Sequence, residues 1–357
     1  MQTAIGDFPQ STTPVYPLYT TKGRNGLTAS FLPLGAVLQK IAFLDNDGLE
    51  HSLALGFPTP ESYASLACYA GAILGPNAGR IRGGRLSLPG AEYALSPNDG
   101  GNQLHGGGHS LSAQLWTMED LACDGRAASI LLSAAQPHGL DGWPGNHSYR
   151  VRYTLSDENR LTIEYEARTD RPTYFNLSSH AYWNLSGKFD HPALGQELTI
   201  YAGRVCVNDG EHLPVSLIPV DGTAFDFRQG RTIESAIHAA RDPVSREQLH
   251  IARGFNHAYL LDGEPGLKRA CALRDHRSGR WMELWTDTPA VVLYSGGFLP
   301  AGLEVNGGQR SVPSCAVALE AQDLPDCSRL APECFRPTLP GEVWRRVIQF
   351  RFHLPPQ

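Results

Sequence analysis

A polar and aromatic segment near the middle of the chain carries residue types that can move protons and bind hydroxyl groups. Residues 171–185 read RPTYFNLSSHAYWNL, so His180 stands among Asn, Ser, Tyr and Trp side chains. Histidine has an unperturbed pKa of about 6.5 and can therefore carry a proton at neutral pH. Amides and hydroxyls pair with sugar hydroxyls, and an aromatic ring can cover the apolar face of a pyranose. The segment alone is equally compatible with a half-buried histidine in a β-strand.

A carboxylate near the C-terminus stands in unusually apolar surroundings. Residues 317–326 read VALEAQDLPD, which places Glu320 inside an apolar run and Gln322 two positions later. Burying a carboxylate among Val, Ala and Leu is costly unless the group is paired or has a function. The alternative is a glutamate at a strand edge that points to solvent, and the segment alone favours that alternative.

A glycine-rich segment carries two further histidines. Residues 102–109 read NQLHGGGH, and glycines next to His105 let the backbone approach a ligand closely. His105 and His109 are four positions apart, which could indicate a metal pair. Three intervening glycines make a helix improbable, and no acidic partner follows at a suitable spacing. We therefore expect no metal and no other cofactor.

A second glycine-rich turn, residues 75–85, carries Arg80, Arg82 and Arg85 in the sequence GPNAGRIRGGR. A phosphate loop is excluded because no Gly-Lys-Ser/Thr ending is present and no helix is expected to follow. The guanidinium group offers a fork of donors, so one arginine could hold sugar hydroxyls. At least two of the three are expected to be exposed on a hairpin.

The composition is that of a globular protein rich in turns. Of 357 residues, 41% are hydrophobic, and 37 Gly and 26 Pro suit many short strands joined by turns. A net charge of −6 without a block of Lys and Arg argues against nucleic acid as a partner. Residues 1–7 lack a basic and an apolar signal region, and no apolar run of about 18 residues suggests a membrane span.

The seven cysteines indicate a reducing compartment. They form an odd, scattered set without Cys-x-x-Cys spacing, so neither a disulfide framework nor a structural zinc site is expected. Together with the missing secretory signal, this predicts a cytoplasmic protein.

Alternation of apolar and polar residues with a period of two dominates the readable segments. Residues 147–155 and 160–167 predict a β-hairpin, and residues 280–286 and 343–352 predict further strands. Helical signal is weak and is confined to residues 234–241. No linker or composition shift divides the chain. We predict a single domain over residues 1–357, all-β, built as a large antiparallel β-sandwich.

Taken together, the four polar segments resemble the aldose 1-epimerase (galactose mutarotase) family. The matching pieces are Gly-Arg-Ile at 79–81, Leu-His-Gly-Gly at 104–107, the Asn-to-Leu segment 176–185 and the Leu-to-Asp segment 319–326. Supporting pieces occur at 141–145, 221–227 and 293–298. The resemblance extends from about residue 18 to residue 352. It implies a galactose mutarotase-like β-supersandwich and no metal requirement.

The resemblance also implies a role for each candidate residue. Interconverting the α and β anomers of a free sugar requires a base at the C1 hydroxyl and an acid at the ring oxygen. By resemblance, Glu320 is the base, His180 the acid, and His105 a supporting group near the ring oxygen. Arg80, Asn256, Gln322, Tyr182 and Trp183 are the expected substrate-binding residues. Alternation puts Tyr182 and Trp183 on opposite faces, so only one of them can meet the sugar.

The chain departs from the family pattern where hydroxyls would be bound. Gly79 stands where many relatives have Asn before the arginine, Asn256-His257 replaces an Asp-His pair, and Val292 stands in place of a Gln. Losing a buried polar partner changes which hydroxyl pattern is tolerated. We therefore expect a sugar preference altered from galactose and glucose.

Three other functions remain open. A hexose-6-phosphate 1-epimerase needs a cationic pocket away from C1, which Arg82, Arg85 or Arg228 could supply. A non-catalytic sugar-binding protein on the same scaffold would have lost the acid or the base, and both are present. A polysaccharide-processing β-sandwich would need a long open cleft and ranks last. The expected partner is a small-molecule sugar, with the protein a monomer or a homodimer.

Overall fold

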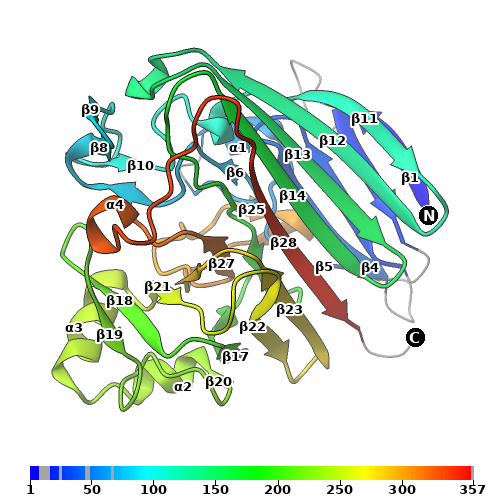
Figure 1. Cartoon of the computed structure of the whole chain (residues 1–357). Coiled ribbons are helices and arrows are strands. Elements are labelled where there is room, and N and C mark those ends of the chain that lie inside the picture. The colour runs from blue at the N-terminus through cyan, green and yellow to red at the C-terminus, as the bar shows by residue number, and fades with distance from the viewer. Residues whose placement is uncertain (8–16, 24–25, 45–48, 66–67, 355–357) are drawn as a thin grey trace.

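Two layers of antiparallel sheet make up most of the molecule (Figure 1). The computed structural model describes residues 1–7, 17–23, 26–44, 49–65 and 68–354. A nine-stranded sheet forms one layer, in the order β11–β12–β13–β14–β28–β23–β22–β17–β20. Its strands are β11 (Thr117–Cys123), β12 (Ala127–Gln136), β13 (His147–Ser156), β14 (Arg160–Thr169), β28 (Trp344–His353), β23 (Arg280–Thr286), β22 (Lys268–Asp275), β17 (Glu197–Ile200) and β20 (Arg231–Thr232).

Two smaller sheets form the other layer. The five-stranded sheet contains β1 (Gln2–Asp7), β2 (Pro17–Lys22), β3 (Thr28–Leu32), β4 (Val37–Leu44) and β5 (Glu50–Ser52), in that order. The six-stranded sheet contains, in spatial order, β16 (Tyr182–Trp183), β27 (Val317–Gln322), β24 (Ala290–Tyr294), β21 (Asn256–Leu260), β18 (Arg204–Asn208) and β19 (Pro214–Pro219).

Short strand pairs and helices complete the fold. The pairs are β6 (Ile73–Leu74) with β15 (Ser178–Ser179), β7 (Arg80–Ile81) with β10 (Gln103–Leu104), β8 (Arg85–Leu88) with β9 (Ala91–Ala94), and β25 (Glu304–Val305) with β26 (Gln309–Arg310). The helices are α1 (Pro60–Ser65), α2 (Ile233–His238), α3 (Pro243–Ala252) and α4 (Cys327–Leu330). No helix in the described part of the chain is long and apolar enough to cross a membrane.

The main core lies between the two layers, which confirms the predicted antiparallel sandwich. In β13, every second side chain is buried, and Tyr149, Val151 and Tyr153 enter the core from the nine-stranded sheet. Leu293 and Leu319 enter the same core from the six-stranded sheet. Period-two alternation places one face of each strand against the core and leaves the other face free. In the six-stranded sheet, that other face builds the site described below.

The predicted hairpin and strands are present. β13 pairs with β14 as the expected hairpin, and residues 280–286 and 343–352 correspond to β23 and β28. The expected helix at 234–241 is α2, but the ten-residue α3 was not predicted. Asp242 caps α3 by accepting a 2.7 Å hydrogen bond from the Ser245 N–H, and Pro243 occupies its first turn. Asp242 followed by Pro243 is a signal for the start of a helix. It was overlooked because the apolar residues that follow form only a weak helical stripe.

Candidate active site

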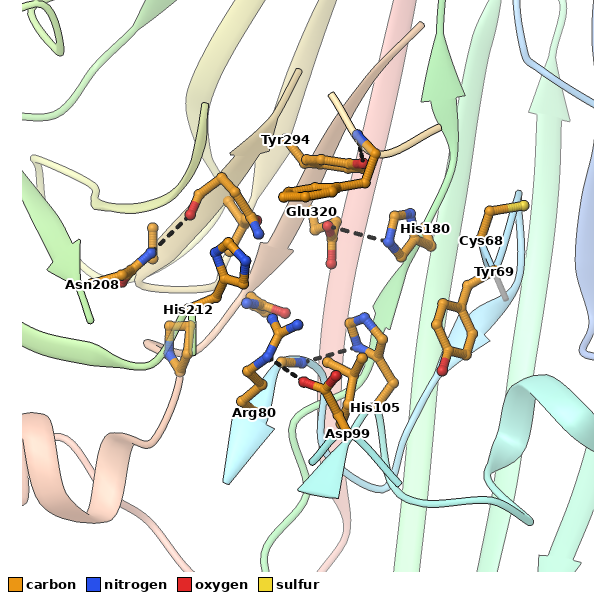
Figure 2. Close-up of a pocket in the computed structure, with 18 of the residues that line it drawn as sticks. Cys68, Tyr69, Arg80, Asp99, His105, His180, Asn208, His212, Tyr294 and Glu320 are labelled. Carbon is orange, nitrogen blue, oxygen red and sulfur yellow. Dashed lines mark hydrogen bonds and ion pairs between the residues drawn. The ribbon is translucent and has the colours of Figure 1, made fainter. Parts of the chain in front are cut away.

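A cavity of about 600 Å³ opens on the outer face of the six-stranded sheet and collects most of the predicted site residues (Figure 2). A volume in this range is typical of small-molecule sites. Loops between the short strand pairs close its opposite wall. The predicted residues that line it are Arg80, His105, His180, Tyr182, Asn256, Glu320 and Gln322.

Glu320 and His180 point toward one another at the centre of this cavity (Figure 2). The Glu320 Oε1 atom lies 3.6 Å from His180 Nε2, and the residues are only 4% and 5% exposed. Strand register creates the contact. β16 pairs with β27 through Tyr182 and Ala318, so the residue two positions before Tyr182 faces the residue two positions after Ala318. Two residues 140 positions apart in sequence thereby meet in one place.

Burial has opposite effects on the two groups, because it disfavours the charged form of each. It raises the pKa of Glu320 to about 8, partly offset by the positive charge of Arg80. It lowers the pKa of His180 to about 4. Tyr69 and Tyr182 contribute to this environment, since both rings stack on His180, at centroid distances of 6.1 and 4.7 Å. Between these two pKa values the pair holds one proton, and it resides on the Glu320 carboxyl.

His105 is held in one tautomer by the backbone. The Gly79 N–H donates a 3.1 Å hydrogen bond to His105 Nδ1, so in the neutral ring Nε2 carries the hydrogen. Burial and the neighbouring His180 lower the pKa of His105, which keeps the ring neutral. A glycine is required after it: a Cβ on Gly106 would lie 2.2 Å from the Gly75 carbonyl oxygen. His105 therefore presents a fixed N–H donor toward the pair.

Gln322 has an unused amide. It is 1% exposed, lies on the same face of β27 as Glu320, and neither its oxygen nor its nitrogen has a hydrogen-bond partner. Buried polar groups almost always have partners, so an unpaired amide that lines a cavity indicates a ligand position. A sugar hydroxyl would satisfy both atoms, because it can donate and accept.

Arg80 is oriented by a residue that the sequence did not single out. Its Nε donates a 2.6 Å hydrogen bond to Asp99 Oδ2, and both residues line the cavity. Asp99 lies in the glycine- and asparagine-rich stretch 98–102, which looks like a simple turn. Tyr69, His212 and Tyr294 also line the cavity without having been predicted as site residues. Their positions depend on packing between distant segments, which single-sequence patterns do not reveal.

The ion pair to Asp99 gives a first testable prediction. Asp99→Asn keeps the size of the side chain but removes the charge that orients Arg80. We expect KM for the preferred sugar to rise about threefold to tenfold with a smaller change in kcat, because a loosened Arg80 weakens binding more than proton transfer. Steady-state polarimetry measures both constants. An unchanged KM would show that Asp99 does not position Arg80.

The position of Trp183 contradicts the prediction that this residue binds substrate. It was expected as a substrate-binding residue, but it is 0% exposed and does not line the cavity. Its ring packs against Phe350 and Phe352 in the core between the layers, at centroid distances of 4.6 and 5.6 Å. Alternation along β16 turns Tyr182 toward the cavity and Trp183 away from it.

His109 does not pair with His105. Its exposed ring contacts Asp141, with 3.1 Å between Nδ1 and Oδ1, and it does not line the cavity. A different set could hold a divalent cation: ligand atoms of His105, His180 and Glu320 lie within 4.8 Å of one another. Two imidazoles and one carboxylate form a plausible ligand set. That no metal is needed stays a prediction.

Comparison with known proteins identifies the family. The sequence model of the family described as aldose 1-epimerase matches residues 17–351. An aldose 1-epimerase from Escherichia coli (strain K12) is 31% identical over 343 residues, covering 94% of this chain and 95% of that protein. The galactose mutarotase of Homo sapiens is 32% identical over 331 residues, 91% of each chain. The chain belongs to the aldose 1-epimerase family.

A solved structure of similar shape agrees with this membership. The crystal structure of a galactose 1-epimerase from Lactobacillus acidophilus superposes with a TM-score of 0.84 at 28% identity, over 99% of both chains. Gly79, Asn256 and Val292, which the sequence predicts to depart from the family pattern, all line the cavity.

Proposed function

We propose that Glu320 and His180 carry the reaction of this aldose 1-epimerase, the interconversion of the α and β anomers of a free sugar. The observation that carries the proposal is the buried 3.6 Å contact between a carboxyl oxygen and an imidazole nitrogen inside a sugar-sized cavity. Mutarotation needs two proton carriers with opposite tasks at one edge of the ring. This pair offers both within one contact.

The reaction follows from the proton positions. The proton of the resting pair first moves from the Glu320 carboxyl to His180 across their contact. Glu320 as carboxylate then removes the proton of the C1 hydroxyl while His180 as imidazolium protonates the ring oxygen. The bond between C1 and the ring oxygen breaks, leaving an aldehyde at C1 and a hydroxyl at C5. Rotation about the C1–C2 bond presents the other face of the aldehyde. The ring then closes as both protons return, and the opposite anomer leaves.

The other lining groups have supporting roles. His105 donates from Nε2 toward the ring oxygen, which favours the departure of that oxygen from C1. Gln322, Arg80 and Asn256 hold hydroxyls elsewhere on the ring, and Tyr182 flanks the sugar beside His180. We further propose a sugar preference altered from galactose and glucose, since Gly79, Asn256 and Val292 change the hydroxyl-binding wall.

A phosphorylated substrate is the less favoured alternative. Among the described residues that line the cavity, Arg80 is the only Lys or Arg, and Asp99 already pairs with it. Arg82 pairs with Asp209, Arg85 pairs with Glu92, and Arg228 pairs with two aspartates, all outside the cavity lining. A phosphate at C6 would lack the cationic partners that bind such groups.

We propose that residues 1–357 act as one domain, as a monomer or a homodimer, in the cytoplasm. Supporting a reducing compartment, all seven cysteines are unpaired and five of them are buried.

The pH dependence of the reaction tests the proposed roles. Below about pH 4 the pair holds two protons and lacks a base, and above about pH 8 it holds none and lacks an acid. We expect kcat/KM to follow a bell with limbs near these values. Polarimetry at a series of pH values, corrected for spontaneous mutarotation, measures this pH profile. The same assay on glucose, galactose, pentoses, deoxysugars and glucose 6-phosphate measures the sugar preference. No acceleration of any sugar would refute the function, and galactose as the best substrate would refute the altered preference.

A further inference from the structure

The catalytic carboxylate belongs to a row of side chains that crosses the six-stranded sheet. Glu320 of β27 pairs in register with Val292 of β24, and Val292 pairs with Ala258 of β21. His180 occupies the position on the other side of Glu320. All four residues line the cavity, so the row runs as histidine, glutamate, valine, alanine along its floor.

The roles proposed above for Glu320 and His180 give the sugar ring a direction along this row. In an aldose ring, C1 is bonded to the ring oxygen on one side and to C2 on the other. With the ring oxygen at His180 and the C1 hydroxyl at Glu320, C2 must lie on the side away from His180. Neighbouring strands are about 4.8 Å apart. In a ring laid along this row, the substituent on C2 lies over Val292 and reaches toward Ala258.

The side chains beneath the C2 substituent, Val292 and Ala258, cannot form a hydrogen bond with it. Val292 and Ala258 belong to a cluster of buried apolar residues that also includes Cys206 and Leu324. The amide groups that the six-stranded sheet contributes to the cavity lie in other rows: Gln322 is two positions along β27 from Glu320, and Asn256 is two positions along β21 from Ala258. A hydroxyl on C2 would lose its water without gaining a partner from the floor.

We propose that this site prefers 2-deoxyaldoses, sugars that carry hydrogen rather than a hydroxyl at C2. A CH₂ group against Val292 and Ala258 buries apolar surface at a position where a hydroxyl would be unpaired. Val292 is accordingly a specificity-determining residue. The inference rests on the proposed placement of the C1 hydroxyl at Glu320 and of the ring oxygen at His180.

The test compares matched sugar pairs. Polarimetry, corrected for the spontaneous rates, gives kcat/KM for 2-deoxygalactose against galactose and for 2-deoxyglucose against glucose. Hydrophobic sites discriminate against an added hydroxyl by up to roughly 100-fold, so we expect the 2-deoxy sugar to be favoured about tenfold or more in each pair. Parent sugars that react as fast as their 2-deoxy forms, or faster, would overturn the proposal.

Two variants locate the preference. Val292→Thr places a hydroxyl at nearly unchanged volume, and we expect it to lower the ratio of 2-deoxy to parent sugar about tenfold. Val292→Ala removes methyl groups without adding a polar atom and keeps the 2-deoxy sugar favoured. Circular dichroism and thermal melting verify that both variants fold. A ratio that Val292→Thr leaves unchanged would contradict the assigned role. Failure to accelerate these four sugars and every other sugar of the panel above would instead refute the proposed function.

Discussion

Glu320→Gln is expected to lower the catalysed rate of anomer exchange by about 10²–10⁴, because the amide cannot accept the proton of the C1 hydroxyl as a carboxylate does. The substitution keeps the size of the side chain, so the fold should survive. Polarimetry or NMR exchange measures the rate. Glu164→Gln is a matched control, because Glu164 is exposed on β14 outside the cavity and should retain full activity. A near-wild-type rate in Glu320→Gln would refute the assignment of Glu320 as the base.

The same variant carries an independent stability signature. The pKa of Glu320 is raised by burial, so the folded state binds the proton more tightly than the unfolded state. This contribution to stability is fully present below the ordinary carboxyl pKa and is lost as the pH rises through about 8. Glutamine never ionises. We therefore expect the melting temperature of Glu320→Gln to gain on that of the wild type as the pH rises from the model carboxyl value of 4.5 to about 8, with no further gain above that pH.

His180→Asn is expected to cause a loss of similar size, about 10²–10⁴ in rate, because asparagine cannot deliver a proton to the ring oxygen. The acid limb of the pH profile should also vanish, since the group with the pKa near 4 is gone. His109→Asn serves as the control: His109 is exposed and lies outside the cavity lining, so its loss should not change the rate. Retention of near-wild-type activity in His180→Asn would exclude His180 as the acid.

The sequence was informative wherever local patterns determine structure. Period-two alternation predicted β13 and β14, and an apolar run predicted the strand that carries Glu320. The same alternation required Tyr182 and Trp183 to face opposite ways. Which of the two meets the cavity depends on which face of the six-stranded sheet packs against the nine-stranded sheet. That choice is made by tertiary packing, so the sequence left both as candidates.

The wall of the cavity opposite the six-stranded sheet was predicted only in part. His105 and Arg80 were recognisable because glycines surround them and their chemistry suits a sugar. Asp99 was not, because Asp in a stretch of Asn and Gly is a common turn residue and its pairing with Arg80 bridges 19 positions. The row of side chains from His180 to Ala258 could not be predicted either, because it depends on strand order and register. The spatial order β16–β27–β24–β21 differs from the order of these strands along the chain.

The direct contact between Glu320 and His180 makes the proposed cycle self-contained. During ring opening one proton enters the carboxylate and another leaves the imidazolium; during closure each returns to the group it came from. The site therefore begins and ends every turnover with the same charge and takes no proton from bulk water. The open-chain sugar meets a carboxylic acid and a neutral imidazole, the very arrangement that burial favours in the empty cavity. The resting protein is in this sense already prepared for the ring-opened intermediate rather than for either ring form.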